Sequence, residues 1–186
     1  MKTILLSKGK NFAIVDDEDF EPLSRFNWRV SESKLKRTLI KYAVRSKWIN
    51  GKSTTICMHR EIMRPPDSMN IDHKNGDGLD NQKDNLRLAN DSQNLANSRK
   101  RRSCSSKYKG VCWHKWNKKW CARTRVNGLL IHLGHFNDEL SAAIAYDRAA
   151  EKYFGEFALT NKAMNLFQSP CPTNPPTQTY DPGTHR

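Results

Sequence analysis

The chain has 186 residues, 37% of them hydrophobic, and a formal net charge of +13, which suits one ordinary domain or two small ones. It has no run of about 18 apolar residues and no apolar signal-peptide core, so we expect no membrane segment and no membrane partner. The five cysteines form no Cys-x-x-Cys pair, which argues against a disulfide framework or a cysteine zinc site and favours a reducing, cytoplasmic setting.

The positive charge is concentrated in the second half of the chain. Residues 1–98 contain 17 basic and 13 acidic residues, whereas residues 99–186 contain 15 and 6. Between Arg99 and Arg125 there are 11 basic residues and no acidic one. A solvated charged face would normally mix the two signs, so this stretch favours an anionic partner, most often a nucleic acid.

Residues 1–66 predict a β-rich extension in which short strands alternate with turns. Asn50-Gly51 lies between two strand-like stretches and predicts a hairpin turn. One short helix is expected within residues 16–26, and another at His59–Met63 is stopped by Pro65-Pro66. We expect His59 to be a partly buried residue at the start of that helix. The expected strands are Ile4–Leu6, Phe12–Val15, Leu39–Val44 and Thr54–Met58.

Residues 67–102 have the densest turn chemistry and predict a strand, a loop, a second strand and a helix. The first strand ends at Ile71–His73, and two Asx-Gly turn dipeptides follow within residues 75–78. The second strand is Leu86–Leu88, with Arg87 facing away from the two leucines. Asp91 has the chemistry of a residue that caps the following helix.

This pattern resembles the HNH (ββα-metal) endonuclease motif. In that family an Asp-His pair ends the first strand, an asparagine lies in the loop, and an asparagine or histidine lies on the helix. The resemblance implies that Asp72 and Asn94 are metal ligands. It also implies that His73 is the general base and that Asn85 orients it. Asn97, three residues beyond Asn94 on the same helix, is the alternative second ligand.

The chemistry of phosphodiester hydrolysis explains these residue types. A water molecule must lose a proton near neutral pH, and histidine titrates in that range. A divalent ion offsets the charge that builds on the phosphate and the leaving oxygen. Oxygen ligands favour Mg²⁺ or Mn²⁺ rather than zinc, and no small-molecule cofactor is expected. A calcium loop is disfavoured because Lys74 stands where that pattern requires Asp or Asn.

Residues 103–165 predict three short strands followed by an Ala-rich helix at about residues 139–154. In each strand apolar residues alternate with basic or aromatic ones, so one face of the sheet packs on the helix and the other is basic. Asn127-Gly128 turns the second strand into the third. From residue 166 onward the chain is rich in Pro, Gly and polar residues, and we expect residues 166–186 to be disordered.

This region resembles the plant AP-two/ERF DNA-binding domain over about 55 residues. The matching motifs are Tyr108–Val111, Lys119-Trp120, Leu133–Phe136, Ala142-Ala143 and Ala145–Ala150. The resemblance implies a sheet that enters the major groove of double-stranded DNA. Several DNA-facing positions, Cys112 among them, lack the Arg or Trp of the plant domains, so the base preference is not carried over. The expected DNA-binding residues are Arg87, Arg99, Lys100, Arg101, Arg102, Lys109, His114, Trp116, Arg123, Arg125 and His132.

The sequence thus predicts an α+β protein. It comprises an N-terminal β-rich extension (1–66), an HNH nuclease core (67–102), a three-stranded antiparallel sheet packed on one helix (103–165) and a tail (166–186). We expect a homing-type endonuclease that cleaves double-stranded DNA, from a phage or prophage. The alternatives are a DNA-binding regulator with an inactive nuclease core and an RNA-binding or RNA-cleaving protein. The extension either braces the first catalytic strand or adds DNA contacts. The sequence sets neither the target site nor the oligomeric state.

Overall fold

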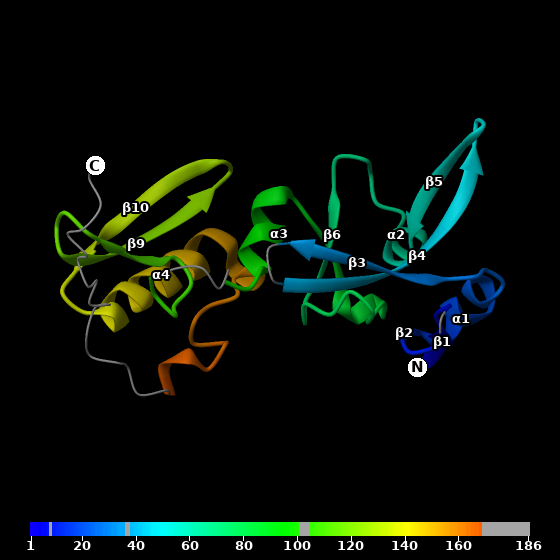
Figure 1. Cartoon of the computed structure of the whole chain (residues 1–186), viewed down its shortest axis with the longest axis horizontal. Helices are drawn as coiled ribbons and strands as arrows, with labels where there is room; N and C mark the ends of the chain where they lie inside the picture. Colours follow the sequence, from blue (N-terminus) through cyan, green and yellow to red (C-terminus); the bar gives the residue numbers. More distant parts are fainter. Residues whose placement is uncertain (8, 36–37, 101–104, 169–186) are drawn as a thin grey trace, which may run out of the picture.

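The computed structural model describes residues 1–7, 9–35, 38–100 and 105–168. These residues form an α+β fold with four small antiparallel sheets. The strands of the N-terminal half and those of the C-terminal half lie at opposite ends of the long axis, with helix α3 (Asp91–Asn97) between them (Figure 1). Within this described part, no helix has the length and apolar character needed to cross a bilayer.

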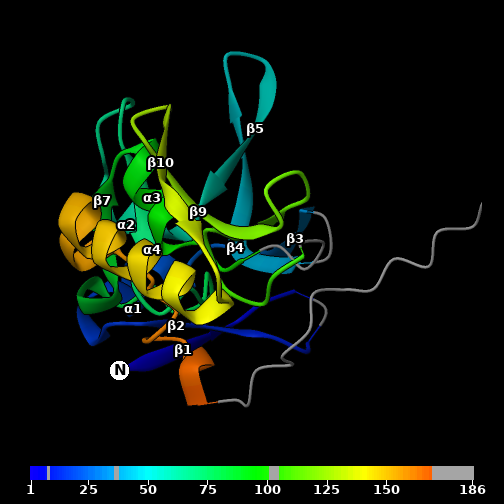
Figure 2. The same cartoon turned by 90° about the vertical axis from the view of Figure 1, so that its left-hand side faces the viewer.

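The N-terminal extension forms two sheets around a common apolar core. Strands β1 (Lys2–Leu5) and β2 (Phe12–Val15) pair with each other, and α1 (Asp17–Ser24) follows them. The second sheet has the order β3 (Arg29–Leu35), β4 (Thr38–Ile49) and β5 (Lys52–Cys57), and leads into α2 (Met58–Met63). The hairpin of β4 and β5 projects away from the rest of this half (Figure 2). Buried core residues include Leu6, Val15, Trp28 and Met58.

The predicted strands and helices of this extension are confirmed. Strand β3 is an additional element, which the sequence did not predict. Residues 29–35 read Arg-Val-Ser-Glu-Ser-Lys-Leu, and only two of these seven side chains are apolar. The strand forms because its backbone pairs along its whole length with β4, from Arg29 opposite Val44 to Leu35 opposite Thr38. Pairing with a long neighbour therefore overrides a weak local preference.

The central region forms two strands and a helix, as predicted. Strand β6 (Asn70–His73) pairs with β7 (Leu86–Ala89) across a loop that contains the 3-10 turn η1 (Lys83–Asn85). The helix α3 is capped by Asn90 and not by Asp91. The Asn90 side chain accepts a hydrogen bond from the Gln93 backbone at 2.9 Å, and the Gln93 side chain accepts one from the Asn90 backbone at 2.9 Å. This reciprocal pair satisfies two backbone donors at once, which Asp91 one residue later cannot do.

The C-terminal module is a three-stranded sheet covered on one face by a helix. Its strands β8 (Val111–His114), β9 (Lys119–Val126) and β10 (Leu129–Phe136) have the order β10-β9-β8. Helix α4 (Glu139–Phe154) is capped by Asp138 and presents small residues to the apolar face. After α4 come the 3-10 turns η2 (Gly155–Phe157) and η3 (Leu166–Gln168).

The ordered chain continues beyond the predicted limit at residue 165. Leu166 and Phe167 pack against the core of the C-terminal module, and the Phe167 ring lies 5.7 Å from that of Tyr108. The expected start of the tail at residue 166 is therefore wrong, because two apolar residues there still find a core to contact. The rest of the expected tail, residues 169–186, lies outside the described residues.

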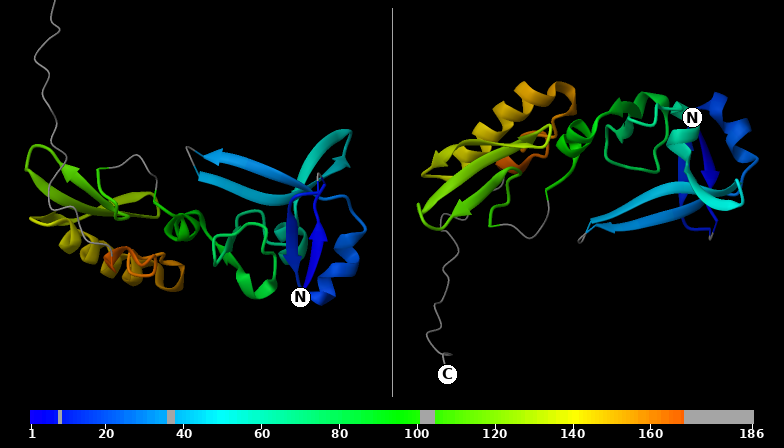
Figure 3. Two further views of the ribbon diagram at one scale, coloured as in Figure 1. Left: turned by 60° about the horizontal axis from the view of Figure 1, so that its bottom comes forward. Right: turned by 90° about the horizontal axis from the view of Figure 1, so that it is seen from above.

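The two halves meet at α3, which packs against α4. Ala96 is buried in one cluster with Tyr146, Ala150 and Phe154. The Ala96 carbonyl also accepts a hydrogen bond from the Leu159 backbone at 3.2 Å. In both views of Figure 3, α3 lies between the two halves. The helix of the central motif is therefore also part of the core of the C-terminal module.

Two glycines in the C-terminal module provide a stability test, because both have positive φ but only one is crowded. A Cβ on Gly110 (φ +76°) would lie 1.8 Å from the Tyr146 ring, whereas one on Gly128 (φ +83°) meets open space. We expect Gly128→Ala to cost about 1–2 kcal/mol of unfolding free energy from backbone strain. We expect Gly110→Ala to have the same strain and to lose about 1–3 kcal/mol more of unfolding free energy, because its new Cβ overpacks against Tyr146. Urea unfolding measures both, and equal losses would contradict the close contact.

Candidate functional site

Asp72 is a buried carboxylate on β6 that faces Arg87 on β7. The Asp72 Oδ2 atom accepts a hydrogen bond from Arg87 Nε at 2.8 Å and forms an ion pair with Arg87 Nη2 at 2.7 Å. Arg87 also donates to the Glu156 carbonyl at 2.8 Å, and its guanidinium lies 4.0 Å from the Phe157 ring centre. The sequence predicted Arg87 as a DNA contact, but its guanidinium is instead held by protein groups on three sides.

Asn97, at the end of α3, approaches the same carboxylate. Its Nδ2 atom is surrounded by oxygen atoms: Asp72 Oδ1 at 3.0 Å, Asp72 Oδ2 at 3.1 Å and the His73 carbonyl at 2.8 Å. Asn94, one turn earlier, has an exposed side chain, and it makes no hydrogen bond to Asp72 among the described residues. Of the two asparagines considered from the sequence, the structure brings Asn97 to Asp72.

His73 lies on the opposite face of β6 from Asp72, because side chains alternate along a strand. Its ring is buried against His59 of α2 at 5.1 Å and Tyr42 of β4 at 5.9 Å, measured between ring centres. Burial lowers the pKa of His73, although the Asn81 side chain and nearby carboxylates, first that of Asp72, oppose this effect. The imidazole is therefore neutral at neutral pH, which is the form that accepts a proton.

Two asparagines of the loop have roles that the sequence did not anticipate. Asn85, expected to orient the histidine, holds the loop: its Oδ1 accepts from the Asn75 backbone at 3.1 Å and its Nδ2 donates to the Asp80 carbonyl at 2.8 Å. Asn81 is fully buried beside His73 instead. Asn81 Oδ1 and His73 Nε2 both lack a hydrogen-bond partner among the described residues. The sequence did not identify Asn81 as a site residue, because Leu-Asp-Asn resembles an ordinary turn.

The N-terminal extension packs directly over the histidine. His59 is buried near the start of α2, as expected, and burial together with His73 lowers its pKa to about 4. Gly78 permits the loop to approach β4, because a Cβ there would lie 2.4 Å from the Lys41 carbonyl and 2.5 Å from the Tyr42 ring. The contact between His59 and His73 was not predicted, since the two residues are fourteen positions apart on different elements.

The outer face of the C-terminal sheet, opposite α4, carries most of the predicted DNA-binding side chains of that module. Arg123, Arg125 and His132 are exposed there, and His114 is half-buried. Trp116, in the turn after β8, is 92% exposed. By contrast, Trp113 and Trp120 pack against each other with ring centres 5.0 Å apart. The predicted division into a packed face and a basic, aromatic face is present in the structure.

Two predicted DNA-binding lysines are occupied by protein carbonyls. The Lys109 ammonium donates to the Ala96 carbonyl and to that of Leu159, and the residue is 9% exposed. The Lys100 ammonium donates to the carbonyls of Ser106 and Tyr108. In this structure both ammonium groups therefore face protein carbonyls at the junction of the two halves, and DNA contact by these two lysines stays a prediction. Arg99 is exposed, whereas Arg101 and Arg102 lie outside the described residues.

The burial of Lys109 predicts a specific dependence of stability on pH. Burial lowers its pKa from 10.5 to about 8, although Asp147 opposes this. Below pH 8 the lysine is charged in the folded and unfolded states, so the cost of burying the charge is fully present. As pH rises from 8 to 10.5 the folded state loses its proton first, and the unfolding free energy should rise by about 3 kcal/mol.

Chemical unfolding across this pH range checks the expectation, with Lys109→Met as the test variant and Lys118→Met, at an exposed turn position, as the control. The rise should disappear in Lys109→Met and persist in Lys118→Met. A rise that is equally large in both variants would assign it to another group.

Comparisons with known proteins agree with the ββα arrangement. The HNH endonuclease family model matches residues 64–96. An uncharacterized HNH endonuclease of Acanthamoeba polyphaga mimivirus is 31% identical over 159 residues, which cover 85% of this chain and 79% of that protein. No solved structure matches.

A second group of similar proteins matches a shorter part of the chain. An AP2-like ethylene-responsive transcription factor of Arabidopsis thaliana is 44% identical over 73 residues, which are 38% of this chain and 21% of that protein. A second ethylene-responsive transcription factor from the same plant is 48% identical over 58 residues, 30% of this chain and 14% of that protein. The mimivirus similarity, by contrast, extends over most of both chains, and this chain therefore belongs to the HNH endonuclease family.

Proposed function

We propose that this nuclease is a divalent-metal-dependent, homing-type endonuclease that hydrolyses phosphodiester bonds of double-stranded DNA. His73 is its general base, and the outer face of the C-terminal sheet binds DNA. The observation that carries the proposal is the arrangement at the end of β6, where oxygen atoms of Asp72 and His73 surround the amide of Asn97. A neutral histidine lies on the same two-residue segment.

The residues present fit a hard cation. HNH nucleases generally depend on a divalent metal. The carboxylate of Asp72 and the neighbouring carbonyls are oxygen ligands of the kind that Mg²⁺ or Mn²⁺ prefers. A half-turn of the Asn97 amide exchanges its nitrogen for its oxygen and adds another such ligand. We assign the metal to Asp72 with Asn97 or Asn94 as its partner. When bound, the ion offsets negative charge on the phosphate and the leaving oxygen.

His73 needs access to water in order to act. Its Nε2 atom is buried and has no partner among the described residues. The Tyr42 ring packs against the His73 ring, and the loop that contains Gly78 packs against Tyr42. We infer that one of them moves aside when DNA binds, after which the neutral imidazole accepts the proton of the attacking water.

The C-terminal sheet supplies affinity and register in this proposal. Its outer face carries Arg123 and Arg125, the exposed Trp116 lies in the turn after β8, and a sheet of this kind fits the major groove of B-DNA. The plant relatives of this module are named as transcription factors, which supports duplex DNA as the ligand. RNA is disfavoured because the major groove of its duplex is deep and narrow.

The second candidate function is a DNA-binding regulator with an inactive nuclease core. The burial of His73 Nε2 favours it, because a base that water cannot reach performs no hydrolysis.

The similarity to a viral protein supports an origin in a phage, prophage or related mobile element acting inside a cell. The division of the chain after residues 66 and 102 is also part of the proposal.

Cleavage assays with purified protein separate these functions. Supercoiled DNA and a structured RNA are each incubated with the protein and Mg²⁺ or Mn²⁺. We expect DNA nicking that falls at least about 100-fold in His73→Ala, while DNA binding is retained, since only the proton acceptor is removed. Absence of DNA cleavage with either ion would favour the regulator, and cleavage of RNA alone would favour an RNA nuclease.

The same assay identifies the helix-borne ligand. Asn97→Ala and Asn94→Ala remove the same side chain from two positions of α3 that are three residues apart. Each variant is therefore a control for the other. The hydrogen bonds of Asn97 lead us to expect the larger loss of cleavage, and the higher Mg²⁺ requirement, in Asn97→Ala. The reverse order would assign the ligand to Asn94.

Salt dependence tests the binding face. Replacing Arg123 and Arg125 together by Ala should weaken duplex binding and flatten the slope of log K against log[salt] by up to about 2, since each phosphate that is no longer neutralised removes roughly 0.9 from the slope. The matched control is Arg148→Ala with Lys152→Ala, two exposed basic positions on α4 behind the sheet. If the two double variants had the same slope of log K against log[salt], the outer face would not be part of the DNA interface.

A further inference from the structure

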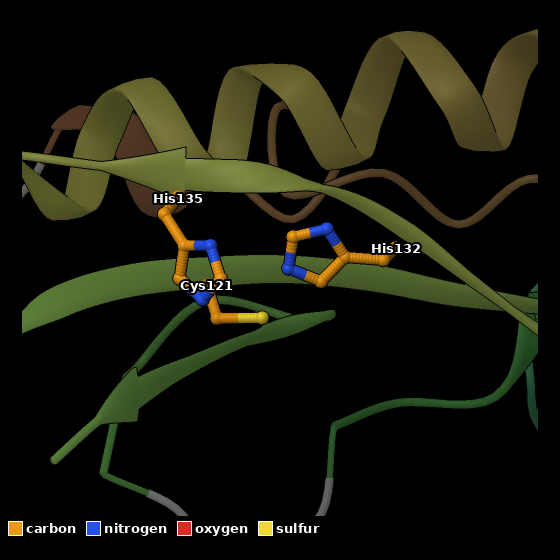
Figure 4. Close-up of side chains that lie close together, drawn as sticks. All are labelled: Cys121, His132 and His135. Atoms are coloured by element: carbon orange, nitrogen blue, oxygen red, sulfur yellow. The ribbon is translucent and has the colours of Figure 1, made fainter. Parts of the chain in front are cut away.

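The outer face of the C-terminal sheet carries a cluster of cysteine and histidine side chains that takes no part in the proposed cleavage chemistry. Cys121 of β9 and His132 and His135 of β10 each offer a ligand atom, and these three atoms lie within 4.8 Å of one another. Figure 4 shows the three side chains side by side on the two neighbouring strands. Cys121 is buried at the base of the cluster, whereas both histidines are open to solvent.

A β-bulge brings the cluster together. His132 pairs with Arg123, but Gly134 pairs with Ala122 and His135 with Cys121, so Leu133 is an extra residue in β10. Without the bulge, strict alternation would put His132 and His135 on opposite faces of the sheet. The bulge reverses the alternation after His132 and turns His135 to the outer face. Sequence patterns did not reveal this cluster, because its three ligands follow no Cys-x-x-Cys spacing.

Neighbouring side chains extend the cluster across the sheet. Cys112 of β8 is directly opposite Cys121, so Cys112, Cys121 and His135 form one row across three strands. The ring centre of His114 lies 5.0 Å from that of His135. The Asn117 side-chain amide lies 3.4 Å from His135 Nε2 and steadies that ring. Side chains directly opposite each other in a sheet are close enough to share a ligand.

We propose that Cys121, His132 and His135 bind a divalent transition metal of the zinc type, at a site separate from Asp72. One thiolate and two imidazoles suit Zn²⁺ and Co²⁺, whereas Mg²⁺ prefers the oxygen atoms of the nuclease core. Cys112, the neighbour of Cys121 across the sheet, is placed to supply the fourth ligand. This proposal is based on the geometry of the three side chains and does not depend on the proposed cleavage or DNA binding.

Metal binding at this cluster is coupled to the release of a proton. Partial desolvation and the nearby His132, His114 and Lys119 lower the pKa of His135. Burial and Cys112 raise the pKa of the Cys121 thiol, which Arg123 opposes. Coordination breaks the S–H bond, forms a metal–sulfur bond and releases the proton to solvent, so affinity should fall as pH falls.

Cobalt binding tests the site, because Co²⁺ replaces Zn²⁺ and reports its ligands by absorption. Metal-free, reduced full-length protein is titrated with Co²⁺. We expect the first equivalent to bind with a thiolate-to-metal charge-transfer band and intense tetrahedral d–d bands, and Zn²⁺ to displace it. Cys121→Ser should abolish the charge-transfer band, and the double variant His132→Ala with His135→Ala should weaken binding about 10- to 100-fold or more.

Matched variants keep this test independent of folding and of the nuclease core. Cys57→Ser, on β5 in the other half, should retain the full cobalt spectrum. The two histidines are exposed, so their double variant should keep the circular dichroism of the parent protein and remains informative if Cys121→Ser fails to fold. Undiminished charge-transfer absorption in Cys121→Ser, or unchanged affinity in the histidine double variant, would overturn the proposal.

Discussion

The ion pair between Asp72 and Arg87 is the constraint around which the nuclease core is arranged. Both side chains are nearly buried, with exposed fractions of 6% and 12%, so neither charge can be left without its partner. Losing one member of such a buried pair typically costs about 3–5 kcal/mol. Arg87 also contacts Glu156 and Phe157 beyond α4. The carboxylate of the candidate metal site is therefore fixed by a residue that is itself held by the C-terminal module.

The loop between the two strands of the core is fixed from the other direction by the N-terminal extension. The backbone of Ile14 in β2 exchanges hydrogen bonds with Leu79 and Asn81, at 2.9 and 2.8 Å. The carboxylate of Asp16 accepts from the Lys83 backbone at 2.8 Å. The extension therefore braces the loop of the central motif. The core thus takes its rigidity from both neighbours.

Features written in local patterns could be predicted from the sequence. The Asn50-Gly51 hairpin, the two strands of the core and the helix Glu139–Phe154 follow from turn chemistry and hydrophobic period, which need no tertiary information. The candidate site was predicted only as far as its motif positions. Which asparagine reaches Asp72, and that Asn81 rather than Asn85 lies beside His73, depend on the packing of α3 and the loop.

The remaining misses share a physical cause. The charges of Arg87, Lys100 and Lys109 suggested phosphate as their partner, but in the fold each side chain donates to carbonyl or carboxylate oxygens of the protein. A sequence shows that a cation is present and does not show which oxygens surround it. The bulge at Leu133 is a similar case, since one added residue changes which side chains share a face without altering the local pattern.

The position of Ala96 bears on how such a protein could be assembled from separate genes. Because this residue is buried among Tyr146, Ala150 and Phe154, the helix that completes the nuclease motif packs directly against the C-terminal module. A recombination breakpoint in the connector after residue 98 would separate surfaces that fit each other and leave apolar side chains in water. Exchange of C-terminal modules between relatives would succeed only if this helix travelled with the incoming module or if the residues on both sides of the junction changed together.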